Sequence, residues 1–157
     1  MAYGADAGPS TRAVHAGEPP AEVYGPVVSP IVLSSTFFSA PDGDGPVLYQ
    51  RYGNAPNHVL LARRLAALEG GEDAIALASG MAAMACALLS LVRAGDHVLA
   101  TDAIYGGTRV LLSEELARLG IETTYVDLTS PGWENGFRPD TKVVLGESPS
   151  NPLLRVL

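Results

Sequence analysis

Four short stretches of this sequence combine residue types that bind anions or small ligands. They are Tyr49-Gln-Arg51, Ser79-Gly80-Met81, Tyr105-Gly-Gly-Thr108 and Glu147-Ser-Pro-Ser-Asn151-Pro152. An arginine holds an anion with a planar fork of donors. A serine–glycine turn in front of a helix presents unpaired backbone N–H groups to the same kind of ligand. Whether the four stretches act together depends on the helices and strands that position them.

The Ser79-Gly80 turn lies between two apolar segments of different character. Residues 73–78 have the pattern of a short buried strand, and the Ala- and Met-rich residues after Gly80 favour a helix. Ser79 is suited to cap that helix, and Gly80 lets a ligand approach the backbone closely. The alternative is an ordinary strand-to-helix turn with a serine cap, which every α/β protein contains.

Tyr49 and Arg51 lie two residues apart, so an extended backbone would place both side chains on the same side. The pair could then hold an anion. The alternative is an exposed arginine that packs on an aromatic ring.

Helices and strands alternate through the second half of the chain. Residues 1–57 are rich in proline, which predicts an irregular apolar arm. Such an arm must pack against something, and we favour a neighbouring subunit. The pattern then predicts helices over 58–69 (capped by Asn57), 80–94 and 109–119, and strands over 73–78, 97–101, 121–126 and 142–146. Alternating strands and helices imply a largely parallel sheet covered on both faces, with ligands beyond the carboxyl ends of its strands.

Composition excludes several classes of function. A net charge of −7, with nine arginines and one lysine, argues against a nucleic-acid surface. The uncharged run 74–92 is divided by Ser79-Gly80 into pieces too short to cross a bilayer. The sequence has one cysteine, Cys86, and therefore no internal disulfide, which favours a reducing, cytoplasmic compartment. We expect Cys86 to be a small residue of the core. The sequence has neither a dinucleotide-binding nor a nucleoside-triphosphate glycine motif.

Five motifs in order resemble those of the Cys/Met-metabolism family of pyridoxal-phosphate enzymes, the cystathionine γ-synthases, γ-lyases and related sulfhydrylases. The resemblance runs from Thr11 to Pro152, and it rests on Tyr49-x-Arg51, Leu68-Glu-Gly-Gly71, Ser79-Gly-Met81, Tyr105-Gly-Gly-Thr108 and Glu147-Ser-Pro-Ser-Asn-Pro152. It implies a three-layer αβα architecture, the first part of an aminotransferase-like (fold type I) large domain. Residues 1–57 would form the arm, and residues 58–157 a truncated portion of the cofactor-binding domain.

The resemblance also implies a role for each motif. Ser79 and the amides of Gly80 and Met81 would bind the phosphate of pyridoxal 5'-phosphate. Tyr105 would be the catalytic residue that stacks on the pyridine ring, and Asn151 would lie near the phenolic oxygen. Tyr49 and Arg51 would also bind the cofactor, by reaching the phosphate in the site of the adjacent subunit. The resemblance thus implies a homotetramer built from dimers, in which two subunits share each site.

The implied reaction is γ-elimination or γ-replacement on a small amino-acid substrate such as cystathionine or an O-acylhomoserine. Methionine γ-lyases carry a cysteine where Gly107 stands, which disfavours that activity. A departure from the family is Asn54-Ala55-Pro56, where the family has Asn-Pro-Thr.

In the family, the lysine that binds the cofactor and the aspartate at the pyridine nitrogen lie downstream of Asn-Pro. Lys142 precedes Glu147 and does not match, so we expect the 157 residues to be inactive alone. The alternative is a non-catalytic α/β fragment that binds phosphate or associates with a partner chain.

Overall fold

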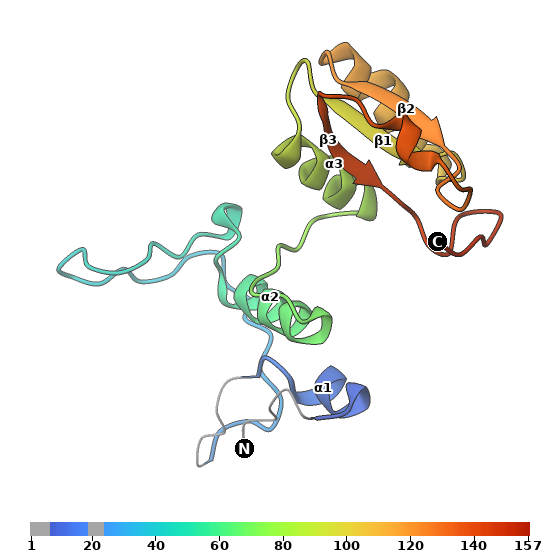
Figure 1. The fold of residues 1–157 in the computed structure, drawn as a ribbon. Helices are drawn as coiled ribbons and strands as arrows, with labels where there is room; N and C mark the ends of the chain where they lie inside the picture. Colours follow the sequence, from blue (N-terminus) through green and yellow to red (C-terminus); the bar gives the residue numbers. More distant parts are fainter. Residues whose placement is uncertain (1–6, 19–23) are drawn as a thin grey trace. The chain divides into compact units, whose positions relative to one another are not determined.

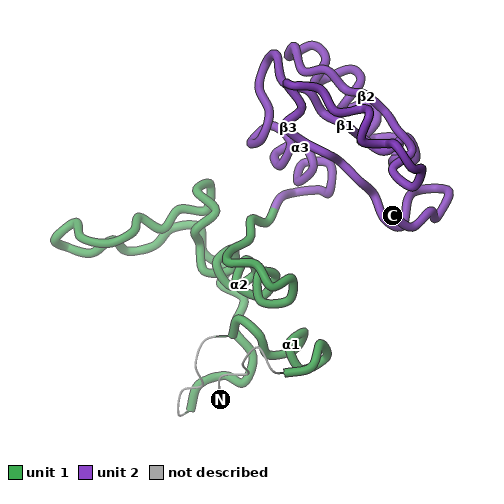
Figure 2. Tube along the Cα trace, in the orientation of Figure 1, with its two compact units in different colours: residues 1–76 green, residues 77–157 purple. Residues whose placement is uncertain are grey.

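The structure is a computed structural model that describes residues 7–18 and 24–157. Its chain divides into two compact units, Met1–Ala76 and Leu77–Leu157 (Figure 2), and each unit is described by itself. The expected division into an arm over residues 1–57 and a portion of the cofactor-binding domain over residues 58–157 stays a prediction. The elements in chain order, drawn in Figure 1, are α1 (Pro9–His15), η1 (Gln50–Tyr52), α2 (Pro56–Glu69), α3 (Gly80–Leu91), β1 (His97–Thr101), α4 (Gly106–Val110), η2 (Leu111–Leu116), β2 (Glu122–Val126), η3 (Trp133–Gly136) and β3 (Thr141–Leu145).

In the first unit, α1 packs on α2. The guanidinium of Arg12 donates to the carbonyls of Ala67 and Leu68 near the end of α2. Gly17 follows α1 with a φ of +76° and approaches α2 so closely that a Cβ there would lie 2.7 Å from the backbone of Arg63. A glycine is therefore required where the chain passes α2.

Helix α2 begins two residues earlier than the pattern predicts, at Pro56, whose fixed φ suits the first helical position. The predicted cap by Asn57 is wrong. Its side chain instead accepts from the N–H of Val32 and donates to the carbonyl of the same residue, both at 2.9 Å. The helix ends as expected at Gly70, in the left-handed region with a φ of 72°.

The arm is irregular from residue 24 to α2, as predicted, but the expectation of no helix fails near its start, where Pro9–His15 form α1. From residue 24 to α2 its regular elements are η1 and one antiparallel bridge, between Thr36 and Tyr49. Most of its large apolar side chains are exposed, with Tyr24 and Phe38 fully accessible. Residues 1–6 and 19–23 of the expected arm lie outside the described residues.

The second unit contains a parallel three-stranded sheet in the order β2-β1-β3. The three strands match the predicted ones to within one residue at each end. The central strand β1 is buried along its whole length. These strands confirm the α/β class with a parallel sheet.

A buried histidine links the three strands through side-chain contacts. His97 opens β1 and is fully buried. Its Nδ1 lies 2.8 Å from Oγ1 of Thr141 on β3, and its Nε2 lies 2.9 Å from Oγ1 of Thr124 on β2. Burial, followed by the nearby charge of Arg138, lowers the pKa of His97. Each ring nitrogen thus has a hydroxyl partner, and burial favours the neutral form of the ring.

The core of the second unit lies on one face of the sheet. Val98 and Ala100 of β1 pack there with Leu88 of α3 and with Leu112 and Leu116 of η2. On the other face, Leu99 is covered by η3: a Cβ on Gly136 would lie 2.6 Å from its Cδ1. The helix predicted over 109–119 begins earlier, at Gly106, and continues as a π-helix from Leu111 to Leu116.

Three expectations about the apolar run around Ser79 are wrong. Residues 73–78 form no strand, because no strand among the described residues offers their backbone a partner. Helix α3 packs beside β3 (Figure 1) but buries only Leu88, and Leu91 is 62% exposed. Cys86 on the same helix is exposed rather than in the core. In the described part of the chain, no helix has the length and apolarity to cross a membrane.

Candidate functional site

The amino end of α3 has the geometry of an anion site. Ser79 has an extended backbone, and its Oγ accepts a hydrogen bond from the N–H of Ala82 at 3.1 Å. A single capping oxygen leaves the N–H groups of Gly80 and Met81 without an intrahelical acceptor. A Cβ on Gly80 would meet no atom within 4 Å, so there is open space beside these donors. A phosphate group therefore fits the residues at this helix end.

Tyr105, Gly107 and Met81 lie together between α3 and α4. Tyr105 directly follows the loop after β1 and is the residue before α4. A Cβ on Gly107 would lie 2.6 Å from Cε1 of Tyr105 and 3.2 Å from Sδ of Met81. Oγ1 of Thr108 lies 4.0 Å from the same sulfur. The Tyr105 ring thus lies over a glycine, next to the first turn of α3, and is 48% exposed.

A carboxylate joins the loop after β1 to the loop after β3. Oε2 of Glu147 accepts from the N–H of Tyr105 at 3.0 Å, and Oε1 accepts from the N–H of Asn151 at 2.7 Å. We call this contact the Glu147 bridge. It holds the backbone of two predicted site residues, which are far apart in sequence, on one half-buried side chain.

The loop that carries Asn151 is closed by its buried neighbour Ser150. The N–H of Ser150 donates to the carbonyl of Arg155 at 2.8 Å, and the N–H of Arg155 donates to Oγ of Ser150 at 3.0 Å. Ser150 is 2% exposed. The side chain of Asn151 itself is exposed.

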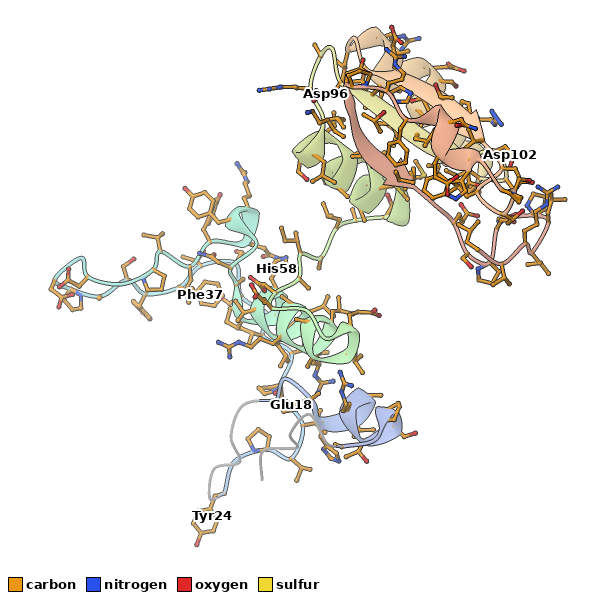
Figure 3. The ribbon with its side chains drawn as sticks, in the orientation of Figure 1. Glu18, Tyr24, Phe37, His58, Asp96 and Asp102 are labelled. Atoms are coloured by element: carbon orange, nitrogen blue, oxygen red, sulfur yellow. The ribbon has the colours of Figure 1, made fainter. Side chains whose placement is uncertain are left out.

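Acidic side chains at the carboxyl ends of β1 and β2 fix the same loop from a second direction. Nη1 of Arg155 lies 3.8 Å from Oδ1 of Asp102 and 3.8 Å from Oδ2 of Asp127. Figure 3 labels Asp96 and Asp102 at the two ends of β1, with Asp102 at the end where these loops meet. Hydrogen bonds from the hydroxyl and N–H of Thr129 lower the pKa of Asp127. All three charges are partly exposed, so the ion pairs contribute little free energy and mainly set orientation.

Tyr49 and Arg51 belong to the first unit. The guanidinium carbon of Arg51 lies 5.7 Å from the centre of the Tyr49 ring, although the backbone between them forms the helical turn η1 and is not extended. Asn54 stabilises this turn, because its side chain accepts from the N–H of Tyr49 and donates to the carbonyl of Val47, each at 2.8 Å. The arginine packed on an aromatic ring was the alternative expected from the sequence. The same contact leaves Arg51 exposed.

Of the sequence-predicted site residues, the second unit groups five and the first unit groups two. Ser79, Gly80 and Met81 form the start of α3, Met81 adjoins Tyr105 through Gly107, and Tyr105 joins Asn151 through Glu147. Sequence reasoning named the motif that contains Glu147 but gave that residue no role. The signal available was a carboxylate directly after a strand whose loop was already predicted to bind a ligand.

These features define an α/β protein with a candidate ligand site beyond the carboxyl ends of parallel strands. The model of the family described as "Cys/Met metabolism PLP-dependent enzyme" matches residues 10–157. The chain belongs to this family of pyridoxal-phosphate (PLP)-dependent enzymes.

Relatives of this chain include a cystathionine gamma-synthase and an L-methionine gamma-lyase. It is 43% identical over 156 residues to the cystathionine gamma-synthase of Mycobacterium tuberculosis, covering 95% of this chain and 39% of the relative. It is 38% identical over 160 residues to the L-methionine gamma-lyase of Fusobacterium nucleatum, covering 96% of this chain and 40% of the relative.

Solved structures of the same family share the fold. The crystal structure of metB from Corynebacterium glutamicum superposes with a TM-score of 0.88 at 34% identity, covering 96% of this chain and 40% of that chain. The cystathionine gamma-lyase of Lactobacillus plantarum, complexed with L-serine, gives 0.86 at 32% identity, covering 96% of this chain and 39% of that chain. The chain therefore spans about 40% of the length of these relatives.

Proposed function

We propose that this chain supplies the phosphate- and ring-binding residues of a transsulfuration enzyme that eliminates or replaces the γ-substituent of cystathionine or an O-acylhomoserine. The observation that supports the proposal most is the connection of Met81, Tyr105 and Asn151 through Gly107 and Glu147. The family resemblance implies that these residues would contact three different parts of one cofactor.

The start of α3 would bind the phosphate of PLP. Because the Ser79 side chain is used by Ala82, the amides of Gly80 and Met81 remain to donate to phosphate oxygens. The positive end of the helix dipole adds to the attraction. The open space beside Gly80 admits the group without a side chain in its way.

Tyr105 and Asn151 would orient the ring. When bound, PLP supplies an electron sink for negative charge that develops on the substrate α-carbon. Tyr105 would lie against one face of the pyridine ring through its partly exposed side chain. The exposed amide of Asn151 would donate a hydrogen bond at the phenolic oxygen.

Lys142 would take no part in this chemistry. It is the second residue of β3, at the amino end of the sheet, whereas Tyr105 and Asn151 follow the carboxyl ends of their strands. From Lys142 to the end of β3 at Leu145, the strand rises by roughly 10 Å. We propose that the cofactor-binding lysine and the acidic partner of the pyridine nitrogen come from sequence corresponding to the relatives' remaining length.

The first unit would serve the site of an adjacent subunit in a cytoplasmic homotetramer. Arg51 offers a forked cation and Tyr49 a phenol, both suited to a phosphate that already accepts from a helix end. The exposed apolar side chains of the arm, such as Ile31 and Leu33, would be covered by that subunit.

The substrate would carry its leaving group on the γ-carbon. Relatives named for cystathionine and for methionine are both similar to this chain. Gly107 favours cystathionine or an O-acylhomoserine over methionine, because methionine γ-lyases resemble this chain but carry a cysteine there.

The direct test is turnover by the protein expressed at its natural length and saturated with PLP. We expect PLP-dependent elimination or replacement on cystathionine or O-acylhomoserine that exceeds methanethiol release from methionine. Failure to turn over any γ-substituted amino acid would contradict the reaction class. Preference for methionine would contradict the substrate assignment alone.

A further inference from the structure

The two hydrogen bonds of the Glu147 bridge come from the backbone of different loops. Tyr105 precedes Glu147 by 42 residues and follows β1, while Asn151 follows Glu147 by four residues after β3. Each carboxylate oxygen takes one N–H, at 3.0 and 2.7 Å. Hydrogen bonds to an ionised acceptor are roughly twice as strong as neutral ones.

We infer that Glu147 is a positioning residue, which sets the distance between the Tyr105 ring and the Asn151 amide by holding both backbones on one carboxylate. This inference rests on the proposed function, because it gives Glu147 a role only through the two residues proposed to contact PLP. Neither side chain is fixed by burial, since both are exposed. Their positions therefore depend largely on how their backbones are held.

The surrounding contacts leave this task to Glu147. The Ser150–Arg155 hydrogen bonds close the Asn151 loop on itself, and Arg155 reaches the aspartates at the ends of β1 and β2 only at 3.8 Å. The Tyr105 side is held by its own helix, in which the N–H of Arg109 donates to the carbonyl of Tyr105 at 3.0 Å. Glu147 is the side chain that connects these two locally ordered loops at the predicted site residues.

Glu147→Gln is the sharpest substitution. It keeps the length and volume of the side chain but replaces one acceptor oxygen with an NH₂ group, so one of the two N–H donors would face another donor. Glu147→Asp keeps the charge but is one methylene shorter and cannot reach both amides, which makes it the second variant. Glu114→Gln is the matched control, because it removes the same charge from an exposed position outside the site.

The first measurement needs no cofactor. Hydrogen–deuterium exchange with residue-level fragmentation, on the protein at its natural length and without PLP, follows the Tyr105 and Asn151 amides. We expect at least one to exchange on the order of ten-fold faster in Glu147→Gln and Glu147→Asp, with no change in Glu114→Gln. Unchanged exchange at both amides in either folded variant would overturn the inference, whatever the protein catalyses.

The second measurement is the dissociation constant of PLP. A positioning role predicts on the order of ten-fold weaker binding in both Glu147 variants and wild-type affinity in Glu114→Gln. If exchange is faster but the affinity for PLP is unchanged, the Glu147 bridge is only a structural contact, and the positioning role of Glu147 is overturned. If the wild-type protein binds no PLP while the exchange result holds, the proposed function fails, and the positioning role fails with it.

Discussion

The ring of Tyr105 occupies the space that a side chain at position 107 would need. A Cβ on Gly107 would lie 2.6 Å from Cε1 of Tyr105, a separation that side-chain carbons do not tolerate. The neighbouring Gly106, in the same helix α4, has no atom within 4 Å of the equivalent position. Two adjacent glycines therefore differ in what a methyl group would meet, and this gives a matched pair of substitutions.

Gly107→Ala should weaken PLP binding, because the ring must move from its place over residue 107. Since the Tyr105 side chain is 48% exposed, it moves with little loss of folding free energy. Loss of an aromatic contact worth about 0.5–1.5 kcal/mol corresponds to a roughly 2- to 12-fold higher dissociation constant. Fluorescence titration with PLP measures it. Gly106→Ala is the control, and equal affinities of the two variants would show that the present ring position does not matter.

Arg51→Ala should also weaken PLP binding if the guanidinium binds the phosphate of an adjacent subunit. Loss of one charge-assisted contact predicts a loss of about 1.5–3 kcal/mol in binding free energy. The substitution should leave the fold intact, because Arg51 is exposed and its described contact is with the Tyr49 ring. Equilibrium dialysis against PLP provides the measurement, and unchanged affinity would remove Arg51 from the site.

Subunit mixing tests whether that contact crosses an interface. Hybrids of Arg51→Ala subunits and Tyr105→Ala subunits should contain some sites with both residues intact, and activity should partly return. Mixed oligomers verified by mass spectrometry that regain no activity would contradict a shared site.

We predict that His97 makes the stability of the protein sensitive to mild acid. The pKa of His97 in the folded state lies below its ordinary value of 6.5. At a pH between the folded-state pKa and 6.5, the unfolded chain therefore binds a proton that the folded chain does not. The free energy of unfolding should therefore fall as the pH drops below about 6.5, and level off at the folded pKa. Burial is the main cause, Arg138 acts in the same direction, and Asp140 and Glu122 oppose it.

Denaturant unfolding between pH 8 and pH 5 checks this dependence. His97→Asn should be less stable at pH 8, since it leaves Thr124 or Thr141 without its partner, but its stability should depend less on pH across this range. Asp127 and Asp140, whose pKa values lie below 3.8, affect stability only in stronger acid. Parallel pH curves for the two proteins would show that His97 is not the titrating group.

Local pattern was sufficient to predict β1 and the end of α2 at Gly70, because burial and a left-handed glycine are encoded in a few adjacent residues. It was not sufficient for residues 73–78 or for the burial of α3. A strand exists only where another strand pairs with it, and an apolar helix is buried only where other elements cover it. Both conditions depend on segments that are distant in the sequence, and the periodicity of one segment contains no information about them.

Local sequence pattern has the same limit at the candidate site. Ser79 was predicted as a cap from its own neighbours, and its bond to Ala82 is present. Glu147 was missed, because its partners include a backbone N–H 42 residues away. A motif indicates that a loop binds something, but only the topology of the sheet brings two such loops to one carboxylate.

Lys142 should not be a specific site of PLP attachment. It lies at the opposite end of β3 from the candidate site. After incubation of the 157-residue chain with PLP and reduction with borohydride, peptide mapping should find no more label on Lys142 than in a denatured control. We also expect no turnover by this chain alone. Stoichiometric, saturable labelling of Lys142 together with elimination activity would contradict both expectations.

The most direct test of the account is a crystal structure of the protein, expressed at its natural length, with PLP bound. The account predicts phosphate oxygens on the amides of Gly80 and Met81, the pyridine ring against Tyr105, and the Asn151 amide at the phenolic oxygen. A phosphate bound away from the start of α3, or a ring that contacts neither Tyr105 nor Asn151, would contradict it.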